Sequence, residues 1–283
     1  MAMRQLHGHA VEKVWGQRAI PAIYANAANG DQPIGEIWFA DAASPGVLVK
    51  RLFTSEKLSI QVHPNDAQAR ASGHVCGKEE AWFILTAEPD ATIGAGFARE
   101  LSDTELRTAA LDGSIEDLMV WHPVKPGDFF YVPAGTVHAI GAGLSLLEIQ
   151  QNVDLTYRLY DYGRPRPLQL DEGMAASVAA PFARSPARAI GPARELLVAA
   201  PSFTIERLGG PCDHHVSATT ADPVWLMPIA AGCISSGIDL APGSVWIADG
   251  PVDIAIEQGG GLLTARAASA QARQDRAENS FAE

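Results

Sequence analysis

Three polar side chains alternate with apolar ones in the first half of one short stretch. In "LSIQVHPNDAQA", residues 58–69, apolar residues alternate with Ser59, Gln61 and His63. A strand alternates its side chains between two faces, so Gln61 and His63 are predicted to point the same way. An exposed face has no need for an amide and an imidazole in place of Thr or Lys. This face is therefore either solvated or the wall of a cavity that requires these atoms.

The alternation also predicts where the apolar residues of this stretch lie. Leu58, Ile60 and Val62 have the opposite parity to Gln61 and His63. We expect all three to pack on the outer side of the strand, away from the polar face.

A second candidate histidine follows a tight turn later in the chain. The spacing is G-x5-P-x-G-x2-H, made by Gly127, Pro133, Gly135 and His138. It resembles the second sequence motif of cupin barrels, except that Ala142 stands where that motif usually has Asn. The stretch 58–69 then resembles the first cupin motif, with Gln in place of one of its two usual histidines. A jelly-roll barrel encloses a cavity, so the polar face need not meet bulk solvent.

Such a buried polar face needs partners, because a buried histidine without a hydrogen bond or a metal is costly. The stretch "GKEEAWF" offers Glu79 or Glu80 as a carboxylate, and alternation allows only one of them to point inward. Lys78 has the parity of Glu80. Two histidines, a carboxylate and an amide oxygen make a mixed nitrogen and oxygen site that suits zinc, or else manganese, iron, cobalt or nickel.

The elements that must position these residues are mostly strands. Short apolar runs separated by Gly, Pro, Asn and Ser recur along most of the chain. A capping box of Ser102 and Glu105 predicts a helix over 102–112 that ends at Gly113, and a second short helix is expected to start near Asp171. We expect a mainly β protein with two cupin-like jelly-roll barrels and a few short helices.

An internal similarity supports two modules. "KPGDFFYVPAG" at 125–135 resembles "APGSVWIADG" at 241–250, but no histidine follows the second copy. We expect a catalytic cupin domain with the metal site at residues 1–165 and a connector with a short helix at 166–195. A second, metal-free cupin-like domain is expected at 196–265, followed by a tail at 266–283.

Composition limits the classes of function. The chain has 283 residues, a net charge of −12 and no basic stripe, which argues against a nucleic-acid partner. A phosphorylated small molecule would need local positive charge. Cys76, Cys212 and Cys233 are widely spaced, which favours reduced thiols over a disulfide or a thiolate metal site. No signal peptide or long apolar run is present, so we expect a cytoplasmic protein with no membrane partner.

Several stretches together resemble the type I mannose-6-phosphate isomerases, which are zinc-dependent cupins, in their short bacterial form. They are "VWG" at 14–16, "LSIQVHPND" at 58–66, "GKEEAWFIL" at 77–85, "PGDFFYVPAGTVHAIGAG" at 126–143 and "LLEIQQNVDLTYRLYDYGR" at 146–164. The resemblance covers roughly residues 10–175 in order.

This resemblance implies roles for particular residues. The implied ligands of one zinc ion are Gln61, His63, Glu80 and His138, which selects Glu80 over Glu79 by resemblance. The implied catalytic residues are Lys78, Asp154 and Arg158, and those in contact with substrate are Ser59, Lys78 and Arg158.

The implied reaction interconverts mannose 6-phosphate and fructose 6-phosphate by proton transfer through an enediol. It needs a base near the moving proton and an electrophile near the oxygens. A bound metal ion and Arg158 can lower the pKa of Lys78 for this purpose, and Asp154 can orient Arg158. The expected partner is a phosphorylated hexose, with the chain a monomer or weak homo-oligomer. An iron-dependent cupin oxygenase and a non-enzymatic sugar-binding cupin are the alternatives.

Overall fold

The computed structural model describes residues 2–27, 32–43 and 46–268, and these residues are mostly β, as predicted. Of the expected tail, 266–283, the first two residues belong to strand β22 (Gly261–Ala267), and the part from residue 269 on lies outside the described residues. The chain forms two compact units. We call Ala10–Trp38 with Lys50–Arg184 the central unit, and Met1–His9, Phe39–Val49 and Ser185–Glu283 the C-terminal unit.

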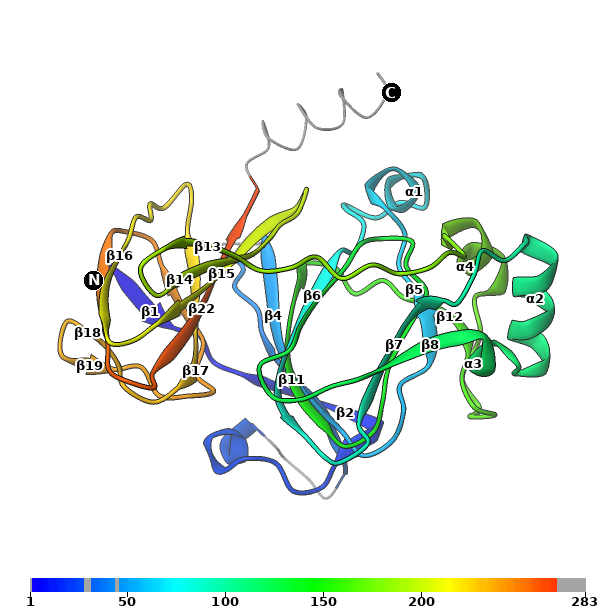
Figure 1. The fold of residues 1–283 in the computed structure, drawn as a ribbon, viewed down its shortest axis with the longest axis horizontal. Coiled ribbons are helices and arrows are strands. Elements are labelled where there is room, and N and C mark those ends of the chain that lie inside the picture. Colours follow the sequence, from blue (N-terminus) through cyan, green and yellow to red (C-terminus); the bar gives the residue numbers. More distant parts are fainter. Residues whose placement is uncertain (1, 28–31, 44–45, 269–283) are drawn as a thin grey trace. The chain divides into compact units, whose positions relative to one another are not determined.

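Two sheets build the central unit (Figure 1). The six-stranded sheet has the order β2-β3-β4-β11-β6-β9, with β2 at His9–Gln17, β3 at Ile34–Phe39, β4 at Val47–Thr54, β11 at Leu144–Gln151, β6 at Glu80–Ala87 and β9 at Phe129–Val132. The five-stranded sheet has the order β12-β5-β10-β7-β8, with β12 at Tyr157–Tyr160, β5 at Ile60–Val62, β10 at His138–Ile140, β7 at Thr92–Phe97 and β8 at Met119–Pro123. A short 3-10 helix, η1, spans Ala22–Ala27.

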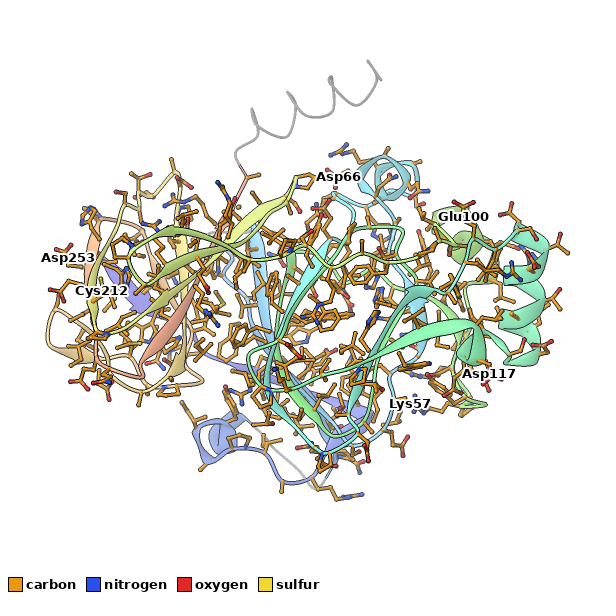
Figure 2. All side chains as sticks on the ribbon, viewed as in Figure 1. Lys57, Asp66, Glu100, Asp117, Cys212 and Asp253 are labelled. Carbon is orange, nitrogen blue, oxygen red and sulfur yellow. The ribbon has the colours of Figure 1, made fainter. Side chains whose placement is uncertain are left out.

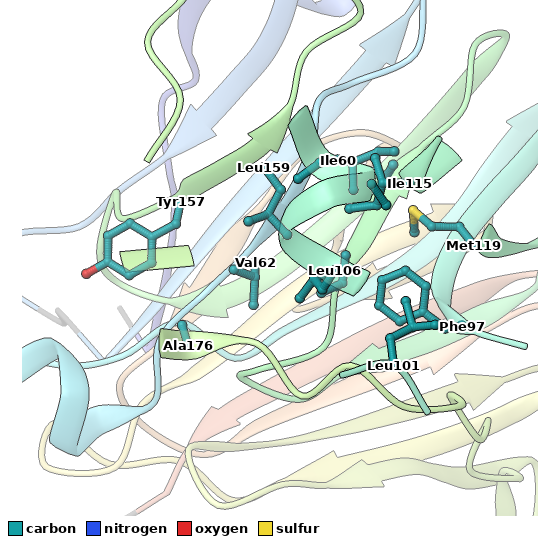
Figure 3. Packing of buried hydrophobic residues seen from close by; sticks show 14 of the residues in the cluster. Ile60, Val62, Phe97, Leu101, Leu106, Ile115, Met119, Tyr157, Leu159 and Ala176 are labelled. Atoms are coloured by element: carbon teal, nitrogen blue, oxygen red, sulfur yellow. The ribbon is translucent and has the colours of Figure 1, made fainter. Parts of the chain in front are cut away.

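Helices cover the outer side of β5. Ile60 and Val62 are fully buried in one cluster with Leu106 of α2, Ile115 of α3 and Ala176 of α4 (Figure 3). These helices span Asp103–Asp112, Ile115–Leu118 and Leu170–Ala176. The apolar side of β5 is thus sealed by helices, which leaves its polar side to face the interior between the sheets.

The prediction for Leu58 is wrong. Regular strand geometry begins only at Ile60, and Leu58 lies in the interior cluster that contains Trp82, Ile84 and Phe130. Because Leu58 precedes the paired segment, strict alternation does not apply to its side chain. It contributes an apolar wall to the interior instead of packing beneath the helices.

The predicted helix over 102–112 is confirmed in detail. Ser102 accepts a hydrogen bond from the backbone N–H of Glu105, whose side chain accepts one from the N–H of Ser102, and Gly113 ends the helix with a φ of 87°. The helix expected near Asp171 is α4. An additional helix, α1 at Asp66–Ala71, was not predicted, although Asn65 and Gln68 form a second capping box at its start.

The C-terminal unit contains a second pair of sheets, consistent with two β modules. In the seven-stranded sheet the strands lie in the order β1 (Met3–Gln5), β20 (Trp246–Ala248), β17 (Val224–Ala230), β22 (Gly261–Ala267), β15 (Phe203–Gly209), β14 (Arg194–Ala199) and β13 (Arg188–Gly191). In the four-stranded sheet the order is β16 (Cys212–Val216), β21 (Val252–Ile256), β18 (Cys233–Ser235) and β19 (Ile238–Asp239).

The repeated Pro-Gly turns are structurally alike. Gly127 and Gly243 have φ values of 91° and 90°, a region that favours glycine, and they precede β9 and β20 respectively. None of the helices in the described ranges has the length and apolar character that a membrane crossing needs.

Candidate functional site

The implied metal ligands meet at the junction of the two central sheets. Gln61 of β5 lies opposite His138 of β10 in the register of the smaller sheet, and His63 directly follows β5. Glu80 begins β6 in the larger sheet. His63, Glu80 and His138 are at most 1% exposed, and one ligand atom from each lies within 4.8 Å of the others. Glu80, and not Glu79, thus joins the two histidines.

His138 presents one ring nitrogen to this cluster. Its Nδ1 donates a hydrogen bond to the carbonyl oxygen of Thr136 at 2.8 Å, which leaves the lone pair of Nε2 pointing inward. Nε2 lies 3.1 Å from Oε1 of Glu80. A backbone carbonyl that fixes the tautomer in this way is typical of metal-binding histidines.

The cluster fits a divalent cation. Oε1 of Glu80 is buried and has no hydrogen-bond donor among the described residues, and Nε2 of His63 lies 3.3 Å from Oε2. Metal–ligand bonds of about 2.1 Å require ligand atoms about 3.0–3.4 Å apart in octahedral or tetrahedral geometry. The observed separations of 3.1 and 3.3 Å match this range. The Lys78 ammonium lies close to Oε2 of Glu80 and Nε2 of His63, whereas Oε1 of Glu80 and Nε2 of His138 repel each other unless a cation lies near them.

Gln61 lies beside the cluster. Its Nε2 is 3.3 Å from Nε2 of His138, and its Oε1 accepts a hydrogen bond from the hydroxyl of Ser59 at 3.2 Å. A half-turn of the amide exchanges its oxygen and nitrogen, which would bring the oxygen to the histidine side. Ser59 and Gln61 therefore form one hydrogen-bonded pair at the edge of the cluster.

Lys78 is buried against the cluster. Its Nζ lies 2.7 Å from Oε2 of Glu80, 3.1 Å from Nε2 of His63 and 3.8 Å from Oε1 of Glu148. Burial opposes the charge, but Glu80 and Glu148 outweigh it and raise the pKa of Lys78 above its ordinary value. Among the chain's own groups, the two nearby carboxylates thus dominate the environment of the ammonium, and the lowering expected from a bound metal ion stays a prediction.

The same interactions set the charge states of two of the implied ligands, His63 and Glu80. Burial and the nearby Lys78 ammonium lower the pKa of His63 to about 3, so its ring is neutral at neutral pH. Burial opposes ionisation of Glu80, but Lys78 and His63 hold the pKa of that carboxyl well below its usual range. A neutral imidazole and an ionised carboxylate are the protonation states that metal binding requires.

Two charged residues at the site were missed by sequence reasoning. Glu148 on β11 accepts a hydrogen bond from Nε1 of Trp82 at 3.1 Å and lies 3.3 Å from Nζ of Lys50. Both Lys50 and Glu148 are at most 4% exposed. Their signal in the sequence is a charge inside an apolar strand, Lys50 beside Arg51 in "VLVKRLF" and Glu148 in "LSLLEIQ", which is costly unless partners are present.

A cavity of about 380 Å³ lies next to the cluster in the central unit. Gln61, Lys78 and Ser59 line it, together with Asp154 and Arg158. Five basic and three acidic side chains contribute to the lining. The basic ones are Lys13, Lys50, Lys78, Arg158 and Arg166, and the acidic ones are Glu36, Glu148 and Asp154. The chain as a whole is acidic, so this cavity supplies the local positive charge that a phosphorylated ligand needs.

Arg158 differs from the arginines that follow it. It lies opposite Gln61 in the register of β12 and β5, and its buried Nε has no hydrogen-bond partner among the described residues. Burial and the nearby Arg166 guanidinium lower the pKa of Arg158. Arg166 itself is held by Asp161 through two hydrogen bonds of 2.6 Å. Arg166 has thus committed two of its donors to Asp161, whereas Nε of Arg158 has no such partner among the described residues and is available to a ligand in the cavity.

The fold and the site together define a cupin-type β protein with a buried histidine–carboxylate cluster, suited to hold a metal ion, at a charged cavity. No family model matches the chain. Mannose-6-phosphate isomerase ManA of Bacillus subtilis is 49% identical over 120 residues, which are 42% of this chain and 38% of that protein. Mannose-6-phosphate isomerase of Streptococcus mutans is 39% identical over 168 residues, 56% of this chain and 53% of that protein. The matched region thus spans about half the length of these curated relatives or less.

Solved structures share the fold over nearly the whole chain. The crystal structure of mannose 6-phosphate isomerase from Bacillus subtilis has a TM-score of 0.79 at 24% identity and covers 94% of this chain and 99% of that one. A variant of phosphomannose isomerase from Salmonella typhimurium has a TM-score of 0.73 at 16% identity, with 95% and 100% covered. The chain is thus similar in sequence to mannose-6-phosphate isomerases over part of its length and shares the cupin fold of the solved ones, which confirms the resemblance seen in its sequence.

Proposed function

We propose that the protein is a metal-dependent aldose–ketose isomerase that interconverts mannose 6-phosphate and fructose 6-phosphate. The observation that carries this proposal is the His63–Glu80–His138 cluster beside a cavity with an excess of basic side chains. The similarity to mannose-6-phosphate isomerases supports the choice of substrate. The reaction is assigned to the central unit, because the described part of the C-terminal unit has no comparable cluster of metal-binding side chains.

Zinc is the proposed metal, one ion per chain, held by Gln61, His63, Glu80 and His138. The donor set of two imidazoles, one carboxylate and one amide oxygen fits zinc, with no thiolate among the ligands. When bound, such an ion supplies a Lewis acid that polarises substrate oxygens. The remaining steps depend on the chain's own side chains.

Lys78 and Glu148 are the proposed groups for proton transfer. The reaction removes the proton from C2 of the aldose and returns one to C1, while the hydroxyl proton at O2 is lost and O1 gains one, so no net proton is consumed. The Lys78 ammonium faces the cavity and can donate to an oxygen on which negative charge develops. Glu148, whose Oε1 lies 3.8 Å from Nζ of Lys78, lines the same cavity and is the proposed base that takes the proton from C2 and returns it to C1, while Lys78 passes the proton of O2 to O1.

Arg158 and Asp154 complete the proposed site. The free donors of Arg158 suit the planar arrangement of two enediolate oxygens or a phosphate. Asp154 lines the same cavity and attracts the Arg158 guanidinium, although less strongly than Asp161 does. Ser59, whose hydroxyl oxygen would accept a hydrogen bond from the amide NH2 of Gln61 once the amide has turned, is proposed to hold both the amide and the substrate in position.

A substrate panel tests this proposal. Purified protein loaded with zinc should convert mannose 6-phosphate to fructose 6-phosphate, measured by a coupled assay, and should act far less on mannose. Binding of sugar phosphates without turnover would favour a sugar-binding cupin. Oxygen consumption with iron and an unphosphorylated substrate would favour an oxygenase. Either outcome would contradict the isomerase proposal.

A further inference from the structure

The segment that carries Lys78 is tied to the segment that follows His63. Residues 77–79 connect the loop after α1 to β6. The backbone N–H of Lys78 donates to the carbonyl oxygen of Pro64 at 3.1 Å, and the N–H of Gly77 donates to Oδ1 of Asp66 at 2.8 Å. Figure 2 shows Asp66 at the start of α1. The carboxylate of Asp66 therefore faces the segment that leads to the metal cluster.

Gln151, the last residue of β11, closes this arrangement. Its Nε2 donates to Oδ1 of Asp66 at 2.9 Å, and its Oε1 accepts from the N–H of Glu79 at 2.9 Å. The backbone N–H of Gln151 also donates to the carbonyl oxygen of Glu79 at 3.1 Å. Asp66 and Gln151 thus hold both neighbours of Lys78 and each other, in a network at the end of β11.

The fit around Gly77 shows how closely the two segments approach. A Cβ at Gly77 would lie 2.5 Å from the carbonyl oxygen of Pro64 and 2.5 Å from the carbonyl carbon of Asn65. These backbone atoms cannot yield without moving the end of β5 that carries His63. The position of Lys78 is therefore determined mainly by this backbone packing and by the Asp66–Gln151 network.

We propose that Asp66 and Gln151 are positioning residues that hold the Lys78 ammonium against the metal cluster. Neither side chain is among those lining the cavity. They act through the backbone of Gly77 and Glu79, so their loss displaces Lys78 while His63, Glu80 and His138 stay in place. The catalytic consequence rests on the proposed function, in which Lys78 transfers protons, whereas the structural consequence can be measured without turnover.

Hydrogen exchange tests the structural part. Asp66→Ala should expose the N–H of Gly77 to exchange, and Gln151→Leu should expose that of Glu79, because each N–H loses its acceptor. Arg70→Ala is the matched control, since Arg70 donates to the other oxygen of Asp66 at 2.8 Å on the exposed side. Exchange in the peptide covering 77–79 is expected to stay slow in Arg70→Ala. Unchanged protection in Asp66→Ala and Gln151→Leu would overturn the proposal.

Kinetics test the catalytic part. Asp66→Ala and Gln151→Leu should each lower kcat roughly 10- to 100-fold, the range that partner residues of metal sites commonly show. The KM should change by less than about threefold, and bound metal should be retained, because substrate and metal contacts remain. Since both residues act through one network, the double variant should lose little more than either single variant. Arg70→Ala should keep the wild-type kcat.

The outcomes separate the two proposals. Full kcat after loss of amide protection, or a fall in kcat that follows loss of metal, would overturn the positioning role. An equal fall in Arg70→Ala would do the same. A zinc-loaded wild-type protein without turnover would refute the isomerase proposal alone. The positioning role would still be tested, since crystal structures of the variants would show whether Lys78 Nζ leaves Glu80.

Discussion

Nε2 of His138 lies 3.1 Å from Oε1 of Glu80, although the two residues begin strands of different sheets. The candidate metal centre therefore depends on both sheets of the central unit. A ligand that binds only this arrangement stabilises the folded state by mass action. Metal binding and folding of the central unit should thus be linked.

Removal of His138 tests this link. His138→Ala should abolish stoichiometric metal binding, because the cluster loses one of two imidazoles, and added zinc should no longer raise the melting temperature. Metal content by mass spectrometry and a thermal scan measure both effects. His74→Ala is the control, since His74 is exposed on a loop and should leave both unchanged. Full metal content in His138→Ala would mean that the ligands lie elsewhere.

Arg158 should matter for turnover and not for the metal. Arg158→Ala is expected to retain the ion and to lower kcat roughly 100- to 1,000-fold, the usual cost of removing a donor to a developing oxyanion. Arg99→Ala serves as a control, because Arg99 is exposed and pairs with Glu105. Steady-state kinetics with metal analysis measure the result. Equal loss of metal in Arg158→Ala would place Arg158 in the metal site itself.

The buried histidine and carboxylate predict a loss of stability in acid. Burial lowers the pKa of His63 from 6.5 to about 3, so the unfolded chain takes up this proton first, and stability falls as the pH drops below 6.5 towards 3. The lowered pKa of Glu80 acts in the same direction, because its ionised form stabilises the fold and is lost in acid. Lys78 and His138 face both groups.

Urea unfolding of the metal-free protein at several pH values measures this effect. A single such group changes the free energy of unfolding by at most about 1.4 kcal/mol per pH unit. In His63→Gln the slope between about pH 6 and 4 should decrease by up to this amount. An identical slope in wild type and His63→Gln would show that His63 does not resist protonation.

The helices that cover β5 should be essential for stability. Leu106 of α2 is 1% exposed and packs against Ile60 and Val62, so Leu106→Ala should lower the free energy of unfolding by about 2–5 kcal/mol. Leu111 on the same helix is 64% exposed, and Leu111→Ala should cost less than about 1 kcal/mol. Similar costs for the two variants would mean that the outer face of β5 is not sealed by α2.

Local signals in the sequence were sufficient for much of the fold. Strand runs, the Ser102–Glu105 capping box and the Pro-Gly turns depend on nearby residues, and the structure confirms them. The Asn65–Gln68 capping box is an equally local signal, and it would have predicted α1. Leu58 was misplaced because alternation applies only within a paired strand, and the start of pairing depends on distant partners.

The candidate site was only partly predictable. The parity of Gln61 and His63 follows from one strand, and the structure does place both at the cluster. The choice of Glu80 over Glu79 came from family resemblance. Lys50 and Glu148 could not be assigned, because their pairing joins residues that are far apart in sequence. The effect of Glu148 in raising the pKa of Lys78 was missed for the same reason, since Glu148 was not recognised as its neighbour.

Chelation and restoration test the central claim most directly. Mannose 6-phosphate turnover is measured in the purified protein, after removal of metal, and after addition of one equivalent of zinc, with bound metal determined each time. The account predicts that turnover is lost with the metal and returns with zinc in proportion to occupancy. Undiminished turnover in the metal-free protein, or none in the zinc-loaded protein, would contradict it.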